Sequence, residues 1–220
     1  MTISHEAIYR HIYTRPQASL NKKLIKLLVR QKTRRRPHKK RRGGGSKIIN
    51  QVSIDNRPKH IEFRNEVGHW EIDLVIGKDH KSAIGTIVER KTRFTLIIKL
   101  KSKKAMEVAN EFSKILNKLN PIYKKSMTYD NGIEMARHEI ITKNTGMKIY
   151  FAHPYSSWER GTNENTNGLI RRYLPKGTNF NEIQLNQLQI IQEKLNNTPR
   201  KIIGYKTPKE MMDLELKFVV

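Results

Sequence analysis

The sequence predicts a mixed α/β fold that carries a basic, helical appendage at its N-terminus. Two observations lead to this prediction. Short apolar segments with strand-like alternation are interleaved with segments of helical periodicity between residues 68 and 200. Positive charge is concentrated in the first 50 residues, which hold 15 Lys or Arg and a single acid, Glu6. We therefore expect a layered α/β domain preceded by a separate basic region.

The N-terminal region contains two short predicted helices. Residues 3–13 place Ile8 and Ile12 on one helix face, with Ser4 as the N-cap. Residues 17–30 repeat leucine at helical spacing, with lysines between.

Three consecutive strands open the expected α/β domain. Residues 69–77 alternate so that Trp70 and Ile72 point toward the core, while Glu71 and Asp73 point to the other face. The next two strands are expected at residues 82–90 and 93–100. Because the connections are short, the three strands should form an antiparallel meander.

Helices and strands alternate after the meander. The expected elements are a helix at 103–119, a strand at 125–130, a helix at 133–145, a strand at 147–152, and helices at 161–174 and 182–197. Gly146 and Pro175 are the stop signals of two of these helices. The order of three strands, helix, strand, helix, strand and helices matches the order of ribonuclease-H-like domains.

The charge of the chain indicates a polyanionic partner. The 220 residues include 44 Lys plus Arg and 20 Asp plus Glu, which gives a net charge of +24. The densest run, residues 30–42, contains nine bases and no acid, and the GGGS segment at 43–46 predicts a flexible linker. Nucleic acid is the favoured partner, and a solubilising or localisation tail is the alternative. The candidate DNA-binding residues of this run are Arg34, Arg35, Arg36, Lys39, Lys40, Arg41 and Arg42.

The absence of cysteine excludes disulfides, thiolate zinc sites and a cysteine nucleophile. No apolar run approaches the roughly 18–20 residues that a membrane helix requires. The eight histidines show no spacing typical of metal ligands. We therefore expect a soluble, cytoplasmic protein without membrane contact.

Three carboxylates stand at positions where a carboxylate is costly or conspicuous. Asp73 lies in the middle of an apolar strand, Asp130 ends a strand before a glycine turn, and Glu164 lies near the start of a predicted helix. If they converge, a divalent cation would remove their repulsion, and hard oxygen ligands favour Mg²⁺ or Mn²⁺.

Each of the three also has a plain structural interpretation. Asp73 could be a hydrogen-bonded strand residue, Asp130 a turn former, and Glu164 a partner of the helix dipole. The acids that compete for the same roles are Glu71, Asp79, Glu134 and Glu159.

Longer strings of residues resemble the insertion-sequence-thirty family of bacterial transposases. They are ISHEAIYRHIY at 3–13, GHWEIDLVIG at 68–77, TYDNGIEMARH at 128–138, YFAHPYSSWERGTNENTNGLIRRYLPKGT at 150–178 and LNNTPRKIIGYKTPKEM at 195–211. The resemblance covers nearly the whole chain. It departs at Ile72, where many members have a small residue.

The resemblance implies a ribonuclease-H-like integrase catalytic core with an Asp-Asp-Glu triad, which falls on Asp73, Asp130 and Glu164. It implies a transposase that uses two Mg²⁺ ions, with Mn²⁺ as the alternative, to cleave DNA at the ends of an insertion sequence and to transfer the 3′-hydroxyl to target DNA. Because two DNA ends must meet, the active complex should be a homo-oligomer, located in the bacterial cytosol at the nucleoid. Two alternatives stay open: a ribonuclease-H-like nuclease without strand transfer, and a catalytically idle DNA-binding fragment.

The resemblance also suggests how the chain is organised. Residues 1–30 would be a helical remnant of the family's DNA-binding region, in a chain truncated at its N-terminus. A basic flexible linker at 31–66, the core at 67–200 and a C-terminal tail at 201–220 would follow.

Around Glu164, the residues expected to hold DNA are Arg160, Asn167, Arg171 and Lys176. Asn167 and Arg171 lie three and seven residues after Glu164 and so share its helix face. The alternative for Arg171 is an ordinary solvated face. Trp158 is expected to pack in its loop rather than to stack on a base.

Overall fold

The computed structural model describes residues 3–14, 18–28, 48–154 and 156–217, so the basic run at 30–42 and the GGGS segment lie outside the described residues. The chain divides into two compact units, Met1–Arg42 and Gly43–Val220. In the first unit, α1 (His5–Thr14) and α2 (Ala18–Leu27) form as predicted. Ser4 caps α1, because its Oγ accepts a hydrogen bond from Ala7 N at 3.2 Å.

The second unit is built on a mixed sheet of five strands. They are β1 (His69–Ile76), β2 (Ala83–Glu89), β3 (Thr95–Lys99), β4 (Ser126–Tyr129) and β5 (Lys148–Phe151). Their spatial order is β3-β2-β1-β4-β5, with β1 antiparallel to β2 and parallel to β4. The predicted antiparallel meander is therefore confirmed, and β4 and β5 extend it on the other side of β1 in the parallel sense.

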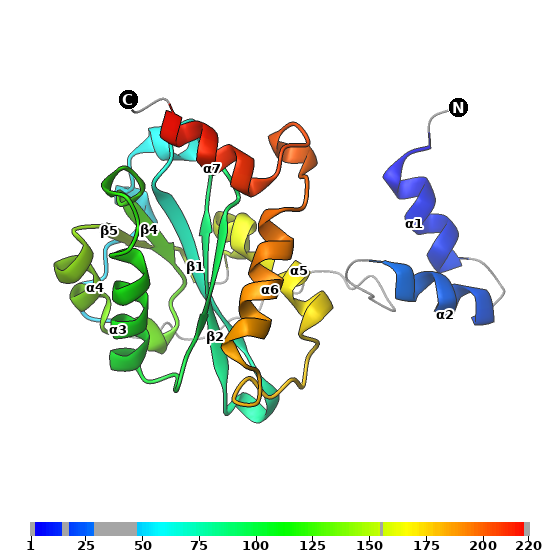
Figure 1. The fold of residues 1–220 in the computed structure, drawn as a ribbon, viewed down its shortest axis with the longest axis horizontal. Coiled ribbons are helices and arrows are strands. Elements are labelled where there is room, and N and C mark those ends of the chain that lie inside the picture. The colour runs from blue at the N-terminus through cyan, green and yellow to red at the C-terminus, as the bar shows by residue number, and fades with distance from the viewer. Residues whose placement is uncertain (1–2, 15–17, 29–47, 155, 218–220) are drawn as a thin grey trace. The chain divides into compact units, whose positions relative to one another are not determined.

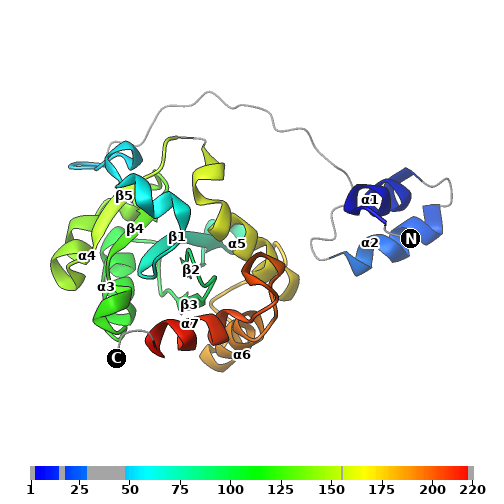
Figure 2. The same ribbon diagram turned by 90° about the horizontal axis from the view of Figure 1, so that it is seen from above.

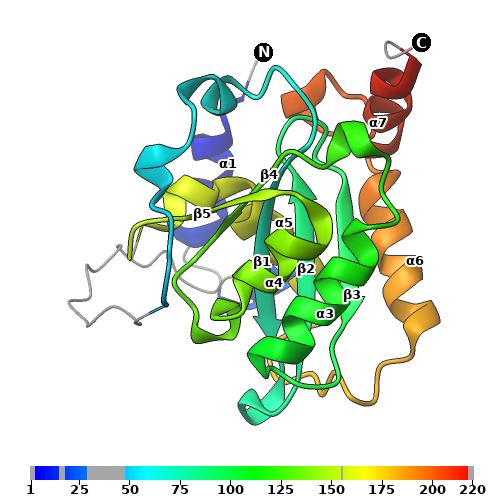
Figure 3. The same ribbon diagram turned by 90° about the vertical axis from the view of Figure 1, so that its left-hand side faces the viewer.

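Helices cover both faces of this sheet. The helices of the second unit are α3 (Ala105–Leu116), α4 (His138–Thr145), α5 (Gly161–Tyr173), α6 (Leu185–Asn196) and α7 (Pro208–Lys217). Figure 1 shows α3 and α4 on one side of the strands and α5 and α6 on the other, and the view from above in Figure 2 shows the same layers. In Figure 3, α3 and α4 lie in front of the sheet. This is the α/β layer arrangement that the alternation of elements predicts.

Short 3₁₀ turns connect the larger elements. They are η1 (Ile54–Asn56), η2 (Lys59–Phe63), η3 (Lys78–His80), η4 (Pro121–Tyr123), η5 (Ile133–Met135), η6 (Ser157–Arg160) and η7 (Lys201–Ile203). The helix expected at 133–145 is thus divided into η5 and α4. It ends as predicted at Gly146, whose φ of 72° places it in the left-handed region that glycine tolerates best.

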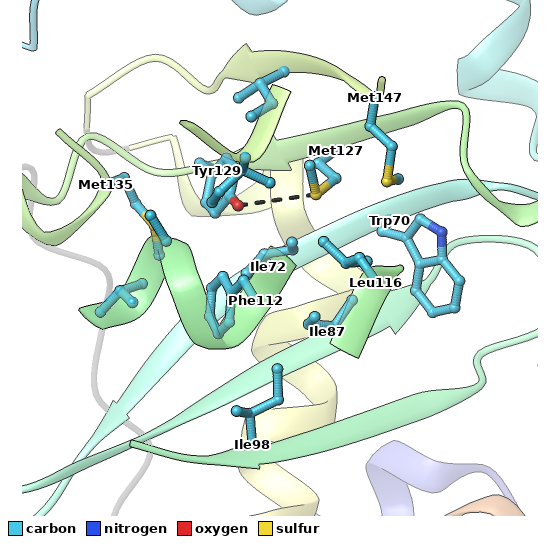
Figure 4. Packing of buried hydrophobic residues seen from close by; sticks show 14 of the residues in the cluster. Trp70, Ile72, Ile87, Ile98, Phe112, Leu116, Met127, Tyr129, Met135 and Met147 are labelled. Atoms are coloured by element: carbon cyan, nitrogen blue, oxygen red, sulfur yellow. Dashed lines mark hydrogen bonds between the residues drawn. The ribbon is translucent and has the colours of Figure 1, made fainter. Parts of the chain in front are cut away.

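The main core lies between the sheet and α3. Trp70 and Ile72 of β1 are fully buried there, as their alternation predicts, together with Phe112 of α3. Figure 4 shows these side chains packed with Met127 and Tyr129 of β4. The Trp70 indole is also satisfied, because its Nε1 donates a hydrogen bond to Tyr123 O at 2.6 Å. A second apolar cluster joins Val75 and Ile84 to α5 and α6.

Two regions are more ordered than the sequence indicates. Residues 48–66, expected as part of a flexible linker, contain η1 and η2, bury Ile61, and pair with β5 through a 2.8 Å hydrogen bond from Phe151 N to Val52 O. Within the expected tail at 201–220, α7 buries Met212, whose carbonyl accepts a 3.0 Å hydrogen bond from the Tyr123 hydroxyl. Both segments pack against the rest of the second unit, to which they belong. None of the helices in the described part of the chain is long and apolar enough to cross a membrane.

The close contact between β2 and α3 gives a test of the core. A Cβ atom at Gly85 would collide with the Phe112 ring. We expect Gly85→Ala to lower the free energy of unfolding by about 1–3 kcal/mol, the usual cost of overpacking. Urea denaturation followed by circular dichroism measures this loss. Phe112→Leu in the same chain should recover part of it, whereas a Gly85→Ala protein as stable as the parent would contradict the packing.

Candidate active site

The register of β1 and β4 brings Asp73 and Asp130 to one end of the sheet. Glu71 pairs with Thr128 across these parallel strands. Asp73 lies two residues beyond Glu71, and Asp130 lies two residues beyond Thr128, directly after β4 ends. This register places the two acids near the same end of the sheet.

Asp73 is held by its neighbours and is only 24% exposed. Its Oδ1 accepts a hydrogen bond from Leu74 N at 2.8 Å, and its Oδ2 accepts one from Asn167 Nδ2 at 3.0 Å. Burial raises the pKa of Asp73 to about 6, with a smaller contribution in the same direction from Asp130, while Arg160 opposes the shift. The charged form of Asp73 is therefore destabilised unless a cation is close.

Asp130 adopts the turn geometry that its Asp-Asn-Gly sequence predicts. Its Oδ1 accepts a hydrogen bond from Gly132 N at 3.0 Å. Its Oδ2 points instead toward Arg160, whose Nη2 lies 3.2 Å away. One carboxylate oxygen thus shapes the turn, and the other faces the site.

The Arg160 guanidinium lies between the two aspartates. Its Nη1 is 3.6 Å from Asp73 Oδ2 and also donates a 3.1 Å hydrogen bond to the carbonyl of Ile72. The side chain is 12% exposed, and its Nε has no hydrogen-bond partner. We expected Arg160 to hold DNA, and that remains a prediction. Its contacts with both acids were not foreseen.

Glu164 is carried on α5, and the first turn of that helix is tied to β1. Asn163 N donates a 2.9 Å hydrogen bond to Glu71 Oε2, and Asn163 Nδ2 donates a 3.0 Å bond to the Glu71 carbonyl. Glu164 itself is exposed. Asn167 lies three residues after it on the same side of the helix, and Arg160 ends η6 directly before the helix begins.

The third acid, Glu164, does not form a compact cluster with the other two. The ligand oxygens of Asp73, Asp130 and Glu164 do not all lie within 4.8 Å of one another. The carboxylates among the main causes of the raised pKa of Asp73 are Asp130 and Glu134. Glu134, which competed with Glu164 for this role in the sequence, is thus also near the site.

Trp158, which we expected to pack in its loop, is 71% exposed.

The other residues near Glu164 have mixed surroundings. Asn167 lies between Asp73 and Thr86, whose hydroxyl is 2.9 Å from Asn167 Oδ1. Arg171 is not simply solvated, because its Nη2 donates a 2.5 Å hydrogen bond to the carbonyl of Ile76. Lys176 is exposed. DNA contacts by these residues remain predictions.

A histidine cluster escaped the sequence analysis. Among the described residues, only His60, Glu66 and His69 place three potential metal ligands within 4.8 Å of one another. Glu66 Oε1 lies 3.0 Å from His60 Nε2 and 2.8 Å from His69 Nε2. Lys125 Nζ is 2.7 Å from the other oxygen, and this contact is the largest cause of a Glu66 pKa of about 2. Because the ammonium already compensates the carboxylate, we interpret the cluster as an ion-pair network.

The contacts of Arg160 predict how stability depends on pH. Between about pH 4 and pH 7 the folded state retains a proton on Asp73 that the unfolded chain releases, so stability without divalent cations should fall as pH rises. We expect Arg160→Gln to lower the free energy of unfolding by a further amount of about 1–3 kcal/mol at pH 8, and by less at pH 5, where Asp73 is largely protonated. Urea titrations at both pH values measure the difference.

Arg172→Gln is the matched control for this experiment. Arg172 is exposed in the last turn of α5, so its loss should change stability by no more than about 0.5 kcal/mol. An equal effect of Arg160→Gln at pH 5 and pH 8 would show that the guanidinium does not neutralise the aspartates.

Comparison with known proteins shows what the chain is similar to. The integrase core domain family matches residues 64–157. The transposase for insertion sequence element IS1086 of Cupriavidus metallidurans is 39% identical over 212 residues, which are 96% of this chain and 62% of that protein. The transposase for IS4351 of Bacteroides fragilis is 45% identical over 208 residues, 94% of this chain and 63% of that protein. The InsI transposase of IS30A of Escherichia coli K12 is 41% identical over 216 residues, 97% of this chain and 56% of that protein.

The chain thus spans about three-fifths of the length of these curated relatives. Among solved structures, the catalytic core domain of BIV integrase superposes with a TM-score of 0.53 at 19% identity, covering 70% of this chain and 99% of that domain. That likeness confirms the ribonuclease-H-like layering of the second unit. Residues 64–157 thus match the integrase core domain family, and most of the chain is similar to insertion-sequence transposases.

Proposed function

We propose that this chain contains the catalytic part of a DNA transposase, which cuts a strand at the end of an insertion sequence and joins the freed 3′-hydroxyl to target DNA. The observation that carries the proposal is the pair of aspartates, Asp73 within β1 and Asp130 directly after the adjacent β4, with a single cationic group between them. The net charge of +24 supports a polyanionic substrate.

The chemistry of the donor set fits divalent cations. Asp73 and Asp130 offer hard carboxylate oxygens, and the position of the Arg160 guanidinium marks where positive charge is stabilised between them. Asp73, Asp130 and Glu164 would hold two Mg²⁺ or Mn²⁺ ions. When bound, such ions would lower the pKa of the attacking water and stabilise the leaving oxygen.

The remaining residues position these groups. Asn167 holds the orientation of the Asp73 carboxylate through its 3.0 Å hydrogen bond. Glu71 fixes the first turn of α5 through the 2.9 Å bond from Asn163 N, so the helix that carries Glu164 keeps its register against β1. Arg160, between the acids and next to that helix, is placed to contact a phosphate oxygen. The active complex would be a homo-oligomer that holds two DNA ends, in the bacterial cytosol at the nucleoid.

The proposal predicts that three carboxylates are indispensable. Asp73→Asn, Asp130→Asn and Glu164→Gln should each lower the rate of strand cleavage by about a thousandfold or more, because each removes a carboxylate that would hold the ions. Each tenfold loss of rate corresponds to about 1.36 kcal/mol of barrier. The assay uses Mg²⁺ and labelled oligonucleotides that carry the ends of the element encoding this chain. Joined products indicate a transposase, cleavage alone indicates a nuclease without strand transfer, and bound but uncut DNA indicates a binding fragment.

Glu134→Gln is the matched control. Glu134 is near Asp73 but is not part of the proposed triad, so this variant should retain cleavage. If Glu134→Gln lost activity while Glu164→Gln kept it, the third acid would be Glu134. All variants should keep salt-sensitive DNA binding, because none of them removes a positive charge.

A further inference from the structure

A basic hollow lies on the flank of α5 that faces away from Asp73. Its volume is about 280 Å³, and Arg64, Arg93 and Arg200 line it together with the α5 residues Thr162 and Thr166. A neighbouring hollow of about 600 Å³ shares Arg64 and Arg93. We call the two hollows together the arginine groove. It is separate from the aspartates, which contact α5 through Asn167 on its other flank.

Among the charged residues of the arginine groove that the structure describes, Lys91 pairs with Glu215 at 2.6 Å, whereas the three arginines form no ion pair. Within the described part of the chain, no carboxylate lies within ion-pair distance of Arg64, Arg93 or Arg200. Arg93 Nη1 donates a 2.6 Å hydrogen bond to the Thr162 hydroxyl, and Arg200 Nη2 donates a 3.0 Å bond to the Leu195 carbonyl. Both acceptors are neutral. The carboxylates that favour the charged arginines, Glu71 for Arg64 and Arg93 and Glu89 for Arg93, lie beyond ion-pair distance.

Burial makes this arrangement costly. It lowers the pKa of all three arginines, that of Arg93 to about 10, and Arg64 lowers the pKa of Arg93 further by like-charge repulsion. Arg93 Nε is buried without a hydrogen-bond partner. An anion in the groove would relieve both the repulsion and the missing contact.

The backbone of two of these arginines is also unusual. Arg64 has a φ of 56° and Arg93 a φ of 67°, in the left-handed region that residues other than glycine seldom adopt. Such conformations persist where the surrounding structure enforces them, and they are concentrated at binding sites. The fold thus retains two strained residues that both turn toward one hollow.

The larger hollow adds a lysine and an aromatic ring to the arginine groove. Lys206 and Phe63 line the larger hollow, and Phe63 is 71% exposed. Positive side chains that follow a groove, with an exposed ring beside them, are the features with which proteins hold a nucleic-acid strand: the charges contact phosphates and the ring stacks on a base.

We propose that the arginine groove binds the sugar-phosphate backbone of a DNA strand through Arg64, Arg93 and Arg200, with Phe63 against a base. The choice of DNA as the polyanion rests on the proposed function. The site itself lies apart from the carboxylates, so binding there requires no divalent cation.

The test measures binding of a fluorescein-labelled oligothymidine to the full chain by anisotropy, in EDTA, over a series of salt concentrations. Arg64→Gln and Arg200→Gln should each weaken binding about threefold to tenfold and reduce the salt slope by about one. Lys114→Gln is the matched control, since it removes one exposed charge from α3, on the opposite face of the sheet. It should leave both quantities nearly unchanged. Circular dichroism confirms that each variant is folded.

Two further measurements localise the site. An oligonucleotide carrying 5-iodouracil should crosslink to the peptide that contains Phe63, and the crosslink should be lost in the Arg64→Gln, Arg200→Gln double variant. Inorganic phosphate should raise the melting temperature of the parent protein but not of this double variant.

The proposal is wrong if Arg64→Gln and Arg200→Gln bind oligothymidine with the same slope as Lys114→Gln. If phosphate stabilises only the parent while strand binding is unaffected, the groove holds a free anion and the assignment to a strand is overturned. Asp73→Asn should bind like the parent protein. A parent protein that binds oligothymidine in the arginine groove but neither cleaves nor joins DNA would contradict the proposed function alone.

Discussion

Two carboxylates on adjacent parallel strands, Asp73 within β1 and Asp130 directly after β4, require positive charge between them. In this structure the Arg160 guanidinium provides that charge, within 3.6 Å of Asp73 and 3.2 Å of Asp130. Arg160 is followed directly by the first residue of α5. Because the neutralising side chain and the helix are adjacent in the chain, the sheet edge, the guanidinium and the start of α5 are fixed relative to one another by one set of contacts.

The other acid of β1, Glu71, has a different role from Asp73 although both lie on the same face of the strand. Glu71 is fully buried and accepts the amide of Asn163 at the start of α5, while Arg90 Nε lies 3.5 Å from its other oxygen. The Glu71 carboxylate therefore interacts with groups inside the protein and has a structural role. Asp73, two residues later, emerges near the edge of the sheet and remains partly exposed. The alternation of a strand places both acids on one face, but only the helix above them distinguishes the structural acid from the candidate ligand.

The contrast explains which features the sequence could predict. Strand alternation and helical periodicity are local, so the five strands, the burial of Trp70 and the end of α4 at Gly146 follow from neighbouring residues. The contacts of Arg160 depend on how a helix sits against a strand almost 90 residues earlier, and no local pattern contains that information. The order of residues 48–66 and of α7 also depends on distant partners, since Ile61 and Met212 become buried only against the assembled sheet layers.

The same helix separates charges of opposite sign. One flank of α5 contacts Asp73 through Asn167, and the other contacts Arg93 through Thr162. Without divalent cations the acidic flank repels a phosphodiester backbone, whereas the proposed arginine groove attracts it without requiring them. A DNA strand would then be held beside the aspartates before the ions that permit chemistry arrive. In that arrangement DNA and divalent cations bind at separate sites, and the two binding events are coupled only through the position of α5.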